Sequence, residues 1–303
     1  MSAVLFKIFG FLLIIGLGFF MKYKRILQPE DSQVLMKIII NITMPAALIS
    51  GFRTFTLDSS LLFALGIGFG FNIILLAAGW IASVGKDPET RALYVLNVPT
   101  HNIGNFSLPF VQGFLPPSAV LCLCMCDAGN NPIGAGITYS AASSLTGGST
   151  RISIRDMLYK LFHSPPFLSY FIMFALYLPG FRLPDAFFDM CSLIGQGNTF
   201  LAMFMLGLIF EFHLTREDIG EVARILGLRY ALCIAAATAI FFLTPFDIVI
   251  RQTLCLCVLA PITTLSVSYG LSCGCKQSMI AALSSMSMVI SFVLSLSVLL
   301  LWA

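Results

Sequence analysis

Asn102-Ile-Gly-Asn-Phe-Ser-Leu-Pro109 is the stretch that decides the fold. It lies in a segment, residues 92–114, that is otherwise apolar enough to cross a membrane. Two asparagines, a glycine, a serine and a proline are costly there, because a polar group without a partner in hydrocarbon loses several kcal/mol. The stretch therefore predicts a membrane helix that is interrupted where its polar groups are used.

The composition places this segment in an integral membrane protein. The 303 residues are 58% hydrophobic and 10% charged, whereas soluble domains have about 25% charged residues. Apolar runs recur along the whole chain, which excludes a signal peptide in front of a soluble domain. The net charge of +3 is too small to indicate a nucleic-acid partner.

The nine cysteines lie in or beside apolar segments, so we interpret them as small apolar residues rather than as disulfide partners. The alternation in Cys122-x-Cys124-x-Cys126 puts neighbouring thiols on opposite faces of a helix, and no histidine cluster accompanies them. We expect no metal site.

The fold class that we expect is an all-α polytopic membrane protein with ten transmembrane helices. The predicted spans are residues 3–20, 34–51, 59–82, 92–114, 117–141, 165–181, 187–211, 222–244, 247–270 and 278–302. Eleven of the 17 Lys and Arg residues lie in the odd-numbered loops and three in the even-numbered ones. The odd loops are therefore expected in the cytoplasm and both termini outside.

The longest cytoplasmic loop divides the chain into two halves. Residues 1–141 form a first five-helix repeat, 142–164 a cytoplasmic linker, and 165–303 a second five-helix repeat. Apolar and basic residues alternate at helical spacing over 151–163, which predicts an amphipathic helix on the inner leaflet. Because each half has an odd number of spans, the two repeats are inverted relative to each other.

Two prolines occupy matching places in these halves. Pro109 in span four and Pro261 in span nine each have small polar neighbours. A proline removes a backbone donor, which a membrane helix tolerates only where the freed groups are buried in protein or line a wet cavity. We expect broken helices four and nine to cross at these prolines near the midplane; the alternative is a pair of ordinary proline kinks.

Several motifs resemble the auxin efflux carrier family. They occur in the family's order and spacing: Gly16-Leu-Gly-Phe-Phe20, Lys24 to Asp31, Asn41 to Ile49, Asn102 to Pro109, Asp127-Ala-Gly-Asn-Asn131, Leu206-Gly-Leu208 and Ala260-Pro261. The short central loop is similar to prokaryotic members. Phe106 and Ser107 depart from the family pattern, which raises the question of whether they select a different substrate.

The resemblance implies a secondary transporter of small organic anions, either mono- or dicarboxylates such as malate or malonate or auxin-like acids. Spans 1, 2, 6 and 7 would form a scaffold against which the remaining spans move as an elevator. It also implies a bacterial inner membrane location and a homodimer that forms through the scaffold helices. The other partners are the lipid bilayer and the anion.

Five residues beside the two prolines are candidates for substrate binding. Asn102 and Asn105 can donate amide hydrogens to a carboxylate, and Gly104 between them allows a close approach to the backbone. Thr263 and Thr264 follow Pro261 in the other half. Hydrogen bonding between helices is the alternative for the asparagines.

Asp127 is the candidate for coupling to a proton or a sodium ion, together with Asn130 and Asn131 one helical turn further on. An acid near the centre of a span is a functional candidate by default. The alternative is a protonated acid that only ties helices together. No other cofactor is expected.

Two further polar residues in the spans receive structural interpretations. His101 is expected to be a neutral histidine satisfied by a neighbour rather than a proton carrier. Arg229 lies near the cytoplasmic end of its span, where a long side chain reaches the interface.

Other functions have weaker support. An intramembrane enzyme would need a nucleophile and a base, and His101 with Cys126 is the only pair, without a motif around either. No nucleotide-binding loop is present, so ATP-driven pumping has no support. A transporter-like sensor that binds a ligand without transporting it is the alternative to a carrier.

Overall fold

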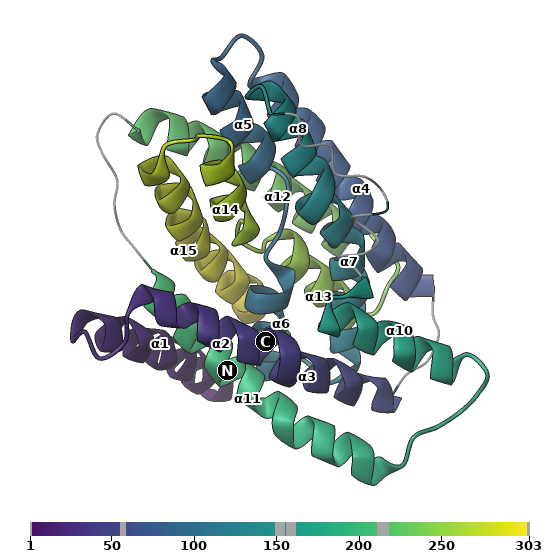
Figure 1. Ribbon diagram of the computed structural model, residues 1–303. Helices are drawn as coiled ribbons and strands as arrows, with labels where there is room; N and C mark the ends of the chain where they lie inside the picture. Colours follow the sequence, from purple (N-terminus) through teal and green to yellow (C-terminus); the bar gives the residue numbers. More distant parts are fainter. Residues whose placement is uncertain (1, 55–58, 149–154, 156–161, 211–217, 302–303) are drawn as a thin grey trace.

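The computed structural model describes residues 2–54, 59–148, 155, 162–210 and 218–301, and the described secondary structure is helical (Figure 1). The helices of the first half are α1 (Ser2–Tyr23), η1 (Pro29–Asp31), α2 (Ser32–Ile38), η2 (Ile39–Thr43), α3 (Met44–Gly51), η3 (Phe52–Thr54), α4 (Ser59–Ala82), α5 (Pro88–Asn97), η4 (Ile103–Ser107), α6 (Leu108–Phe114), α7 (Ser118–Pro132), η5 (Ile133–Ile137) and α8 (Thr138–Leu145).

The helices of the second half are α10 (Pro165–Tyr177), α11 (Asp185–Ile209), α12 (Ile219–Leu243), α13 (Ile248–Val258), α14 (Leu265–Ser272) and α15 (Gln277–Leu301). The amphipathic linker helix expected at 151–163 falls mostly on residues 151–154 and 156–161, which lie outside the described part of the chain.

Within the described residues, six helical segments are long and apolar enough to cross a membrane. They are Leu5–Tyr23, Pro29–Gly51, Ser59–Ala82, Asp185–Ile209, Ile219–Leu243 and Gln277–Leu301. The other expected spans coincide with helices that are broken, interrupted by a wider turn, or short. The all-helical, polytopic fold class is therefore confirmed.

The helices pack in two groups, and each group combines helices from both halves of the chain. In the first group α11 lies beside α1 and α3, and α10 lies beside α3 (Figure 1). In the second group α4 packs on α7, α5 on α8, and α13 on both α7 and α12, while α15 packs on α13 and α14. Contacts of α6 with α11 and of α3 with α7 join the groups.

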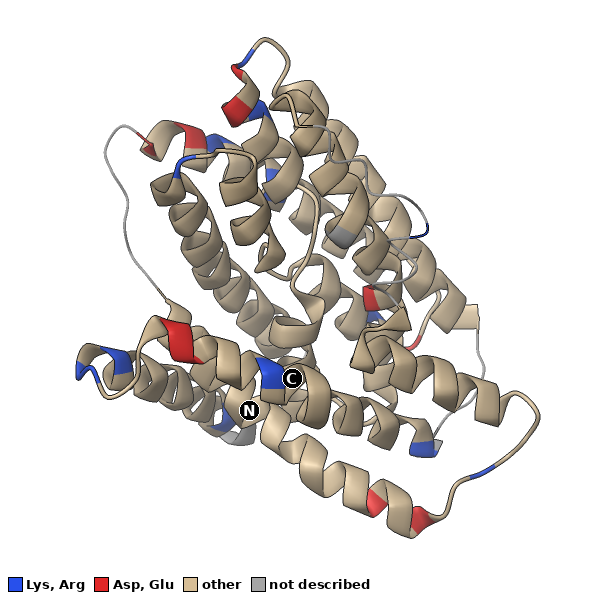
Figure 2. Cartoon of the chain, viewed as in Figure 1, with Lys and Arg blue, Asp and Glu red and all other residues tan. Residues whose placement is uncertain are grey.

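Charged residues gather at the helix ends and in the loops, and long uncharged stretches lie between them (Figure 2). All nine cysteines are buried and unpaired, which confirms their interpretation as apolar packing residues. Two charged residues of the helices that are treated below, Asp127 and Arg229, depart from this distribution.

Three π-helical turns lie next to three of the prolines of the first half. The turn η2 ends just before Met44-Pro45, η4 ends just before Leu108-Pro109, and η5 follows Pro132. A π turn is wider than an α turn and is frequent at functional sites, and here it lets the helix continue past a residue that lacks an N–H donor.

The first half-helix of each broken span begins in the same way. Asp87 caps α5 by accepting a hydrogen bond from the backbone N–H of Thr90 at 2.9 Å, and Asp247 caps α13 by accepting one from Val249 at 2.9 Å. An aspartate at this position satisfies amide groups that the helix leaves without partners. The two caps fix where the two half-helices begin.

Replacing Asp87 with alanine is expected to lower the free energy of unfolding by about 1 kcal/mol at neutral pH, because the cap of α5 is lost. The N–H and side chain of Thr90 hold the pKa of the Asp87 carboxyl below its ordinary value of 3.8. The stabilisation by the charge is therefore present above pH 3.8 and is lost as the pH falls through the lowered pKa. Thermal unfolding in detergent at neutral and acidic pH measures this, and Asp87→Asn, which keeps the cap, is the control; an equal loss in both variants would contradict the cap.

Candidate functional site

The first break is the non-helical segment of residues 98–102 between α5 and η4. Thr100 within it has a φ of +74°, a conformation that is rare for a β-branched residue. Its backbone N–H donates to Oδ1 of Asn72, on α4, at 2.8 Å. Strained backbone that is held in this way by its surroundings is characteristic of functional sites.

Asn130 on α7 holds the next peptide of the first break. Its Oδ1 accepts the backbone N–H of His101 at 3.1 Å, and its Nδ2 donates to the carbonyl of His101 at 2.9 Å. Oδ1 also accepts from Nδ2 of Asn72 at 3.2 Å. The side chains of Asn72 and Asn130 thus replace the helical hydrogen bonds that the first break gives up.

The second break, residues 259–264 between α13 and α14, meets the first directly. The backbone N–H of Asn102 donates to the carbonyl of Pro261 at 2.8 Å. Nε2 of His101 lies 3.0 Å from the carbonyl oxygen of Val258, and its Nδ1 lies 3.2 Å from Oδ1 of Asn72. His101 is therefore a buried histidine with an acceptor oxygen beside each ring nitrogen, and its neutral state stays a prediction.

Arg229 on α12 corrects one interpretation made from the sequence. Its side chain is fully buried instead of reaching the interface. Nη1 donates to the carbonyls of Asn97, Val98 and Pro99 at 3.2, 2.7 and 3.1 Å, and Nη2 donates to the carbonyl of Ala260 at 2.8 Å. One guanidinium thus satisfies carbonyls that both breaks free.

Of the two prolines that were expected at the crossing, only Pro261 lies in a break. Pro261 lies in the second break and accepts the hydrogen bond from Asn102. Pro109 lies in the first turn of α6, beyond η4, so the proline within the first break is Pro99 instead. The π turn explains the difference, because it lets the helix continue through Pro109 without a break.

A cavity of about 240 Å³ adjoins the two breaks. We call it the polar cavity, and it contains the predicted substrate-binding residues together with Asp127 and Asn131. Its lining is Met36, Ile40, Met44, His101, Asn102, Ile103, Gly104, Asn105, Asp127, Ala128, Asn131, Ser164, Pro166, Phe167, Tyr170, Thr263, Thr264 and Leu265. Asn130 is not part of the lining and instead supports the first break.

Two amide side chains of the polar cavity have atoms without a partner. Among the described residues, Nδ2 of Asn102, whose residue is 4% exposed, is a buried donor without an acceptor, and Oδ1 of Asn105 is a buried acceptor without a donor. A buried donor without a partner costs about 1–3 kcal/mol. A ligand that accepts a hydrogen bond from Asn102 removes this cost.

Asp127 on α7 faces Gly104 across the polar cavity. A Cβ placed on Gly104 would lie 3.6 Å from Oδ2 of Asp127 and would collide with the side chain of Met44. Oδ1 of Asp127 accepts from Nδ2 of Asn130 at 3.2 Å, which links the acid to the first break. Nδ2 of Asn131 donates to the backbone carbonyl of Asp127 at 2.9 Å.

The polar cavity is lined by the beginnings of two helices rather than by basic side chains. Among the described residues that line it, Asp127 is charged and no Lys or Arg is present. The first residues of η4 and of α14 lie in its wall, at Ile103 and Leu265. The amide groups at the start of a helix carry a partial positive charge that attracts anions.

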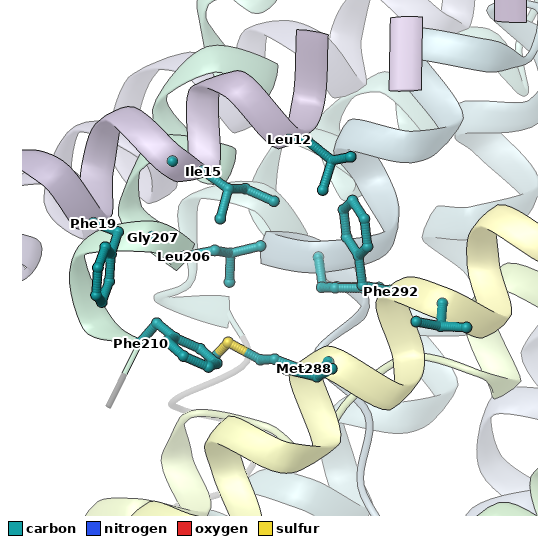
Figure 3. Close-up of a pocket in the computed structure, with 12 residues that line it drawn as sticks. Leu12, Ile15, Phe19, Leu206, Gly207, Phe210, Met288 and Phe292 are labelled. Carbon is teal, nitrogen blue, oxygen red and sulfur yellow. The ribbon is translucent and has the colours of Figure 1, made fainter. Parts of the chain in front are cut away.

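A larger cavity of about 440 Å³ is almost wholly apolar and lies where α1 and α11 face α15 (Figure 3). We call it the apolar cavity, and it offers no donor to a carboxylate. Phe106 lines it, and the hydroxyl of Ser107 donates to the carbonyl of Leu256 at 2.8 Å. The two residues that depart from the family pattern therefore lie outside the lining of the polar cavity.

Three parts of the site were not predicted from the sequence. Asn72 is a lone amide in an otherwise apolar span, and that isolation is a usable signal. Arg229 lies several residues inside its span, which already argues against an interfacial side chain. No feature of the sequence indicates the strained backbone at Thr100.

These features define a multi-pass membrane transport protein. A protein family described as "membrane transport protein" matches residues 3–155 of the chain. The chain belongs to this family, the auxin efflux carriers. The resemblance is thereby confirmed, and so is the expectation that the chain is not an enzyme, because the family is one of transporters.

The matched region contains the motifs from Gly16 to Asn131. The likeness of Leu206-Gly-Leu208 and Ala260-Pro261 to the family lies beyond it and stays a prediction. A search of curated proteins finds no match to the chain.

Proposed function

We propose that the protein is a secondary transporter of small organic anions, and that the anion binds in the polar cavity. The Nδ2 of Asn102 carries this proposal, since it is a buried donor without a partner among the described residues and belongs to a residue that lines a cavity where two helices begin. The carboxylate accepts from Asn102 and from the amide groups at the start of η4 and α14. Mono- and dicarboxylates both belong to this class.

The proposed architecture has ten spans in two inverted five-helix repeats, with broken helices four and nine crossing at Pro99 and Pro261. The matching aspartate caps of α5 and α13, and the hydrogen bond from Asn102 to Pro261, support it. Residues 1–141 and 165–303 are the repeats, and 142–164 is the linker.

The proposed movement is an elevator. The first group of helices (α1–α3, α10 and α11) is the scaffold, and the second group carries the substrate. The apolar cavity between α1, α11 and α15 supports this, because a surface that is not closely packed can slide at lower cost than a filled core. Contact between two copies through the scaffold stays a prediction from the resemblance.

The polar cavity is proposed to open toward the cytoplasm. Its lining includes Ser164 and Pro166, at the start of α10, which follows the basic linker. The helix of span six, α10, has 13 residues and is short beside a typical span of about 20. This leaves access to the cavity from the side on which the odd loops lie, with both termini outside, as in a bacterial inner membrane.

Coupling is proposed to run through Asp127, the charged residue of the polar cavity. Asn130 and Asn131 both donate to Asp127, and Asn130 connects it to the first break. A change in the charge of Asp127 changes its electrostatic interaction energy with an anion in the same cavity. The coupling ion is a proton or sodium.

A thermal-shift screen of the purified protein against mono- and dicarboxylates, at two pH values and with or without sodium, tests the proposed function. We expect at least one carboxylate to raise the melting temperature saturably, because it binds the folded state. The uptake of that acid into proteoliposomes should exceed uptake into empty vesicles. Binding without uptake would show a sensor, and neither binding nor uptake by any acid would contradict the proposal.

A further inference from the structure

Arg229 is a buried cation that has no role in the proposed binding site. It is 0% exposed, and among the described residues no carboxylate forms an ion pair with it. Removing a charge from water is costly unless the protein supplies dipoles in return. The groups that surround Arg229 therefore require a positive charge.

The surroundings of Arg229 are those of a cation site. Its four acceptors are backbone carbonyls, three at the end of α5 and one just after α13. The carboxyl end of a helix carries a partial negative charge, and unwound carbonyls at broken helices are the groups that bind coupling cations in transporters. Here the guanidinium occupies that position.

We propose that Arg229 is a built-in cation that takes the place of a bound coupling cation at the crossing, so that the carrier functions without sodium. This inference rests on the proposed function and narrows its coupling to a proton at Asp127. The crossing then has a fixed positive group at the ends of α5 and α13 and an anion at the starts of η4 and α14.

A covalently attached cation differs from a bound one in a way that suits this arrangement. Sodium can leave the crossing, and its departure frees the carbonyls and loosens the contact between the two breaks. Arg229 is attached to α12 and cannot leave, so Val98 and Ala260 keep their partner in every state of the transport cycle. The crossing therefore moves as one unit.

The test compares the wild type with Arg229→Ala and with Arg224→Ala, in sodium chloride and in choline chloride of equal ionic strength. Arg224 lies on the same helix and is a matched control, because its side chain is 69% exposed and pairs with Glu221. Melting temperatures are measured without substrate, and guanidinium chloride is added at low millimolar concentration, where it does not denature proteins. Sodium-dependent uptake is measured separately in proteoliposomes.

The wild type and Arg224→Ala are expected to melt at the same temperature in both salts. Arg229→Ala is expected to melt on the order of 10 °C lower, and guanidinium or sodium, but not choline, should restore part of this loss saturably. The space left by the side chain then holds the cation that the carbonyls require.

Saturable stabilisation of the wild type by sodium would overturn the proposal, and so would a folded Arg229→Ala variant that responds to neither cation. If Arg229→Ala does not fold, the sodium response of the wild type still decides. Because the melting measurements use no substrate, a failure to transport any anion contradicts the proposed function and leaves this test intact.

Discussion

Replacing Asn102 with alanine is expected to weaken anion binding about ten- to hundredfold, which is the loss of one hydrogen bond to a charged group worth about 1.5–3 kcal/mol. Nδ2 of Asn102 has no hydrogen-bond partner among the described residues, so the loss of this amide group breaks no hydrogen bond that they make to it. The bond from Asn102 to Pro261 involves the backbone and is retained. Fold stability should therefore stay unchanged or rise slightly while affinity falls.

Asn97→Ala is the matched control for this prediction. Asn97 is also a buried amide beside the first break, but it lies outside the lining of the polar cavity. Titration of the anion identified by the thermal-shift screen gives the dissociation constant of each variant. Equal losses of affinity in both variants, or full affinity in Asn102→Ala, would show that Asn102 does not hold the substrate.

Replacing Asp127 with asparagine is expected to remove the pH dependence of binding and transport. An ionised acid about 6 Å from a bound carboxylate repels it by about 3 kcal/mol at an effective dielectric constant near 20, which is about a hundredfold in affinity. The wild type should bind its anion more tightly as the pH falls and Asp127 takes up a proton. Asp127→Asn should bind at all pH values as the protonated wild type does.

Transport follows the same reasoning. A pH gradient should drive accumulation of the anion by the wild type, and Asp127→Asn should only equilibrate it. Asp189→Asn is the control, because Asp189 is an exposed acid that pairs with Arg53 and lies outside the lining of the polar cavity. If Asp127→Asn still accumulates the anion in response to pH, or if wild-type binding is independent of pH, coupling through Asp127 is wrong.

The sequence predicts the membrane class and the residues of the polar cavity because both depend on where polar groups occur in apolar segments. Asn102, Asn105 and Asp127 stand out against their spans, and the structure brings all three to one cavity. Asn72 also stands out in its apolar span, but its role does not follow from the local pattern, because the groups that it holds in the first break, the backbone N–H of Thr100 and the ring of His101, lie 28 and 29 residues away.

The position of the first break could not be predicted from the sequence pattern. A proline predicts an interruption, yet the helix passes Pro109 by a π turn and breaks around Pro99. The choice depends on tertiary contacts, namely the amides of Asn72 and Asn130 and the guanidinium of Arg229, which stabilise open backbone at residues 98–102. Those partners come from distant helices, and only the folded chain brings them together.

The most direct test of the binding site is an experimental structure of the protein with the carboxylate that the screen identifies. We expect the ligand in the polar cavity, with a carboxylate oxygen at hydrogen-bonding distance, about 2.7–3.2 Å, from Nδ2 of Asn102 and close to the first residues of η4 and α14. A ligand bound in the apolar cavity between Phe106 and Phe292, or at a site that does not include Asn102, would contradict this assignment.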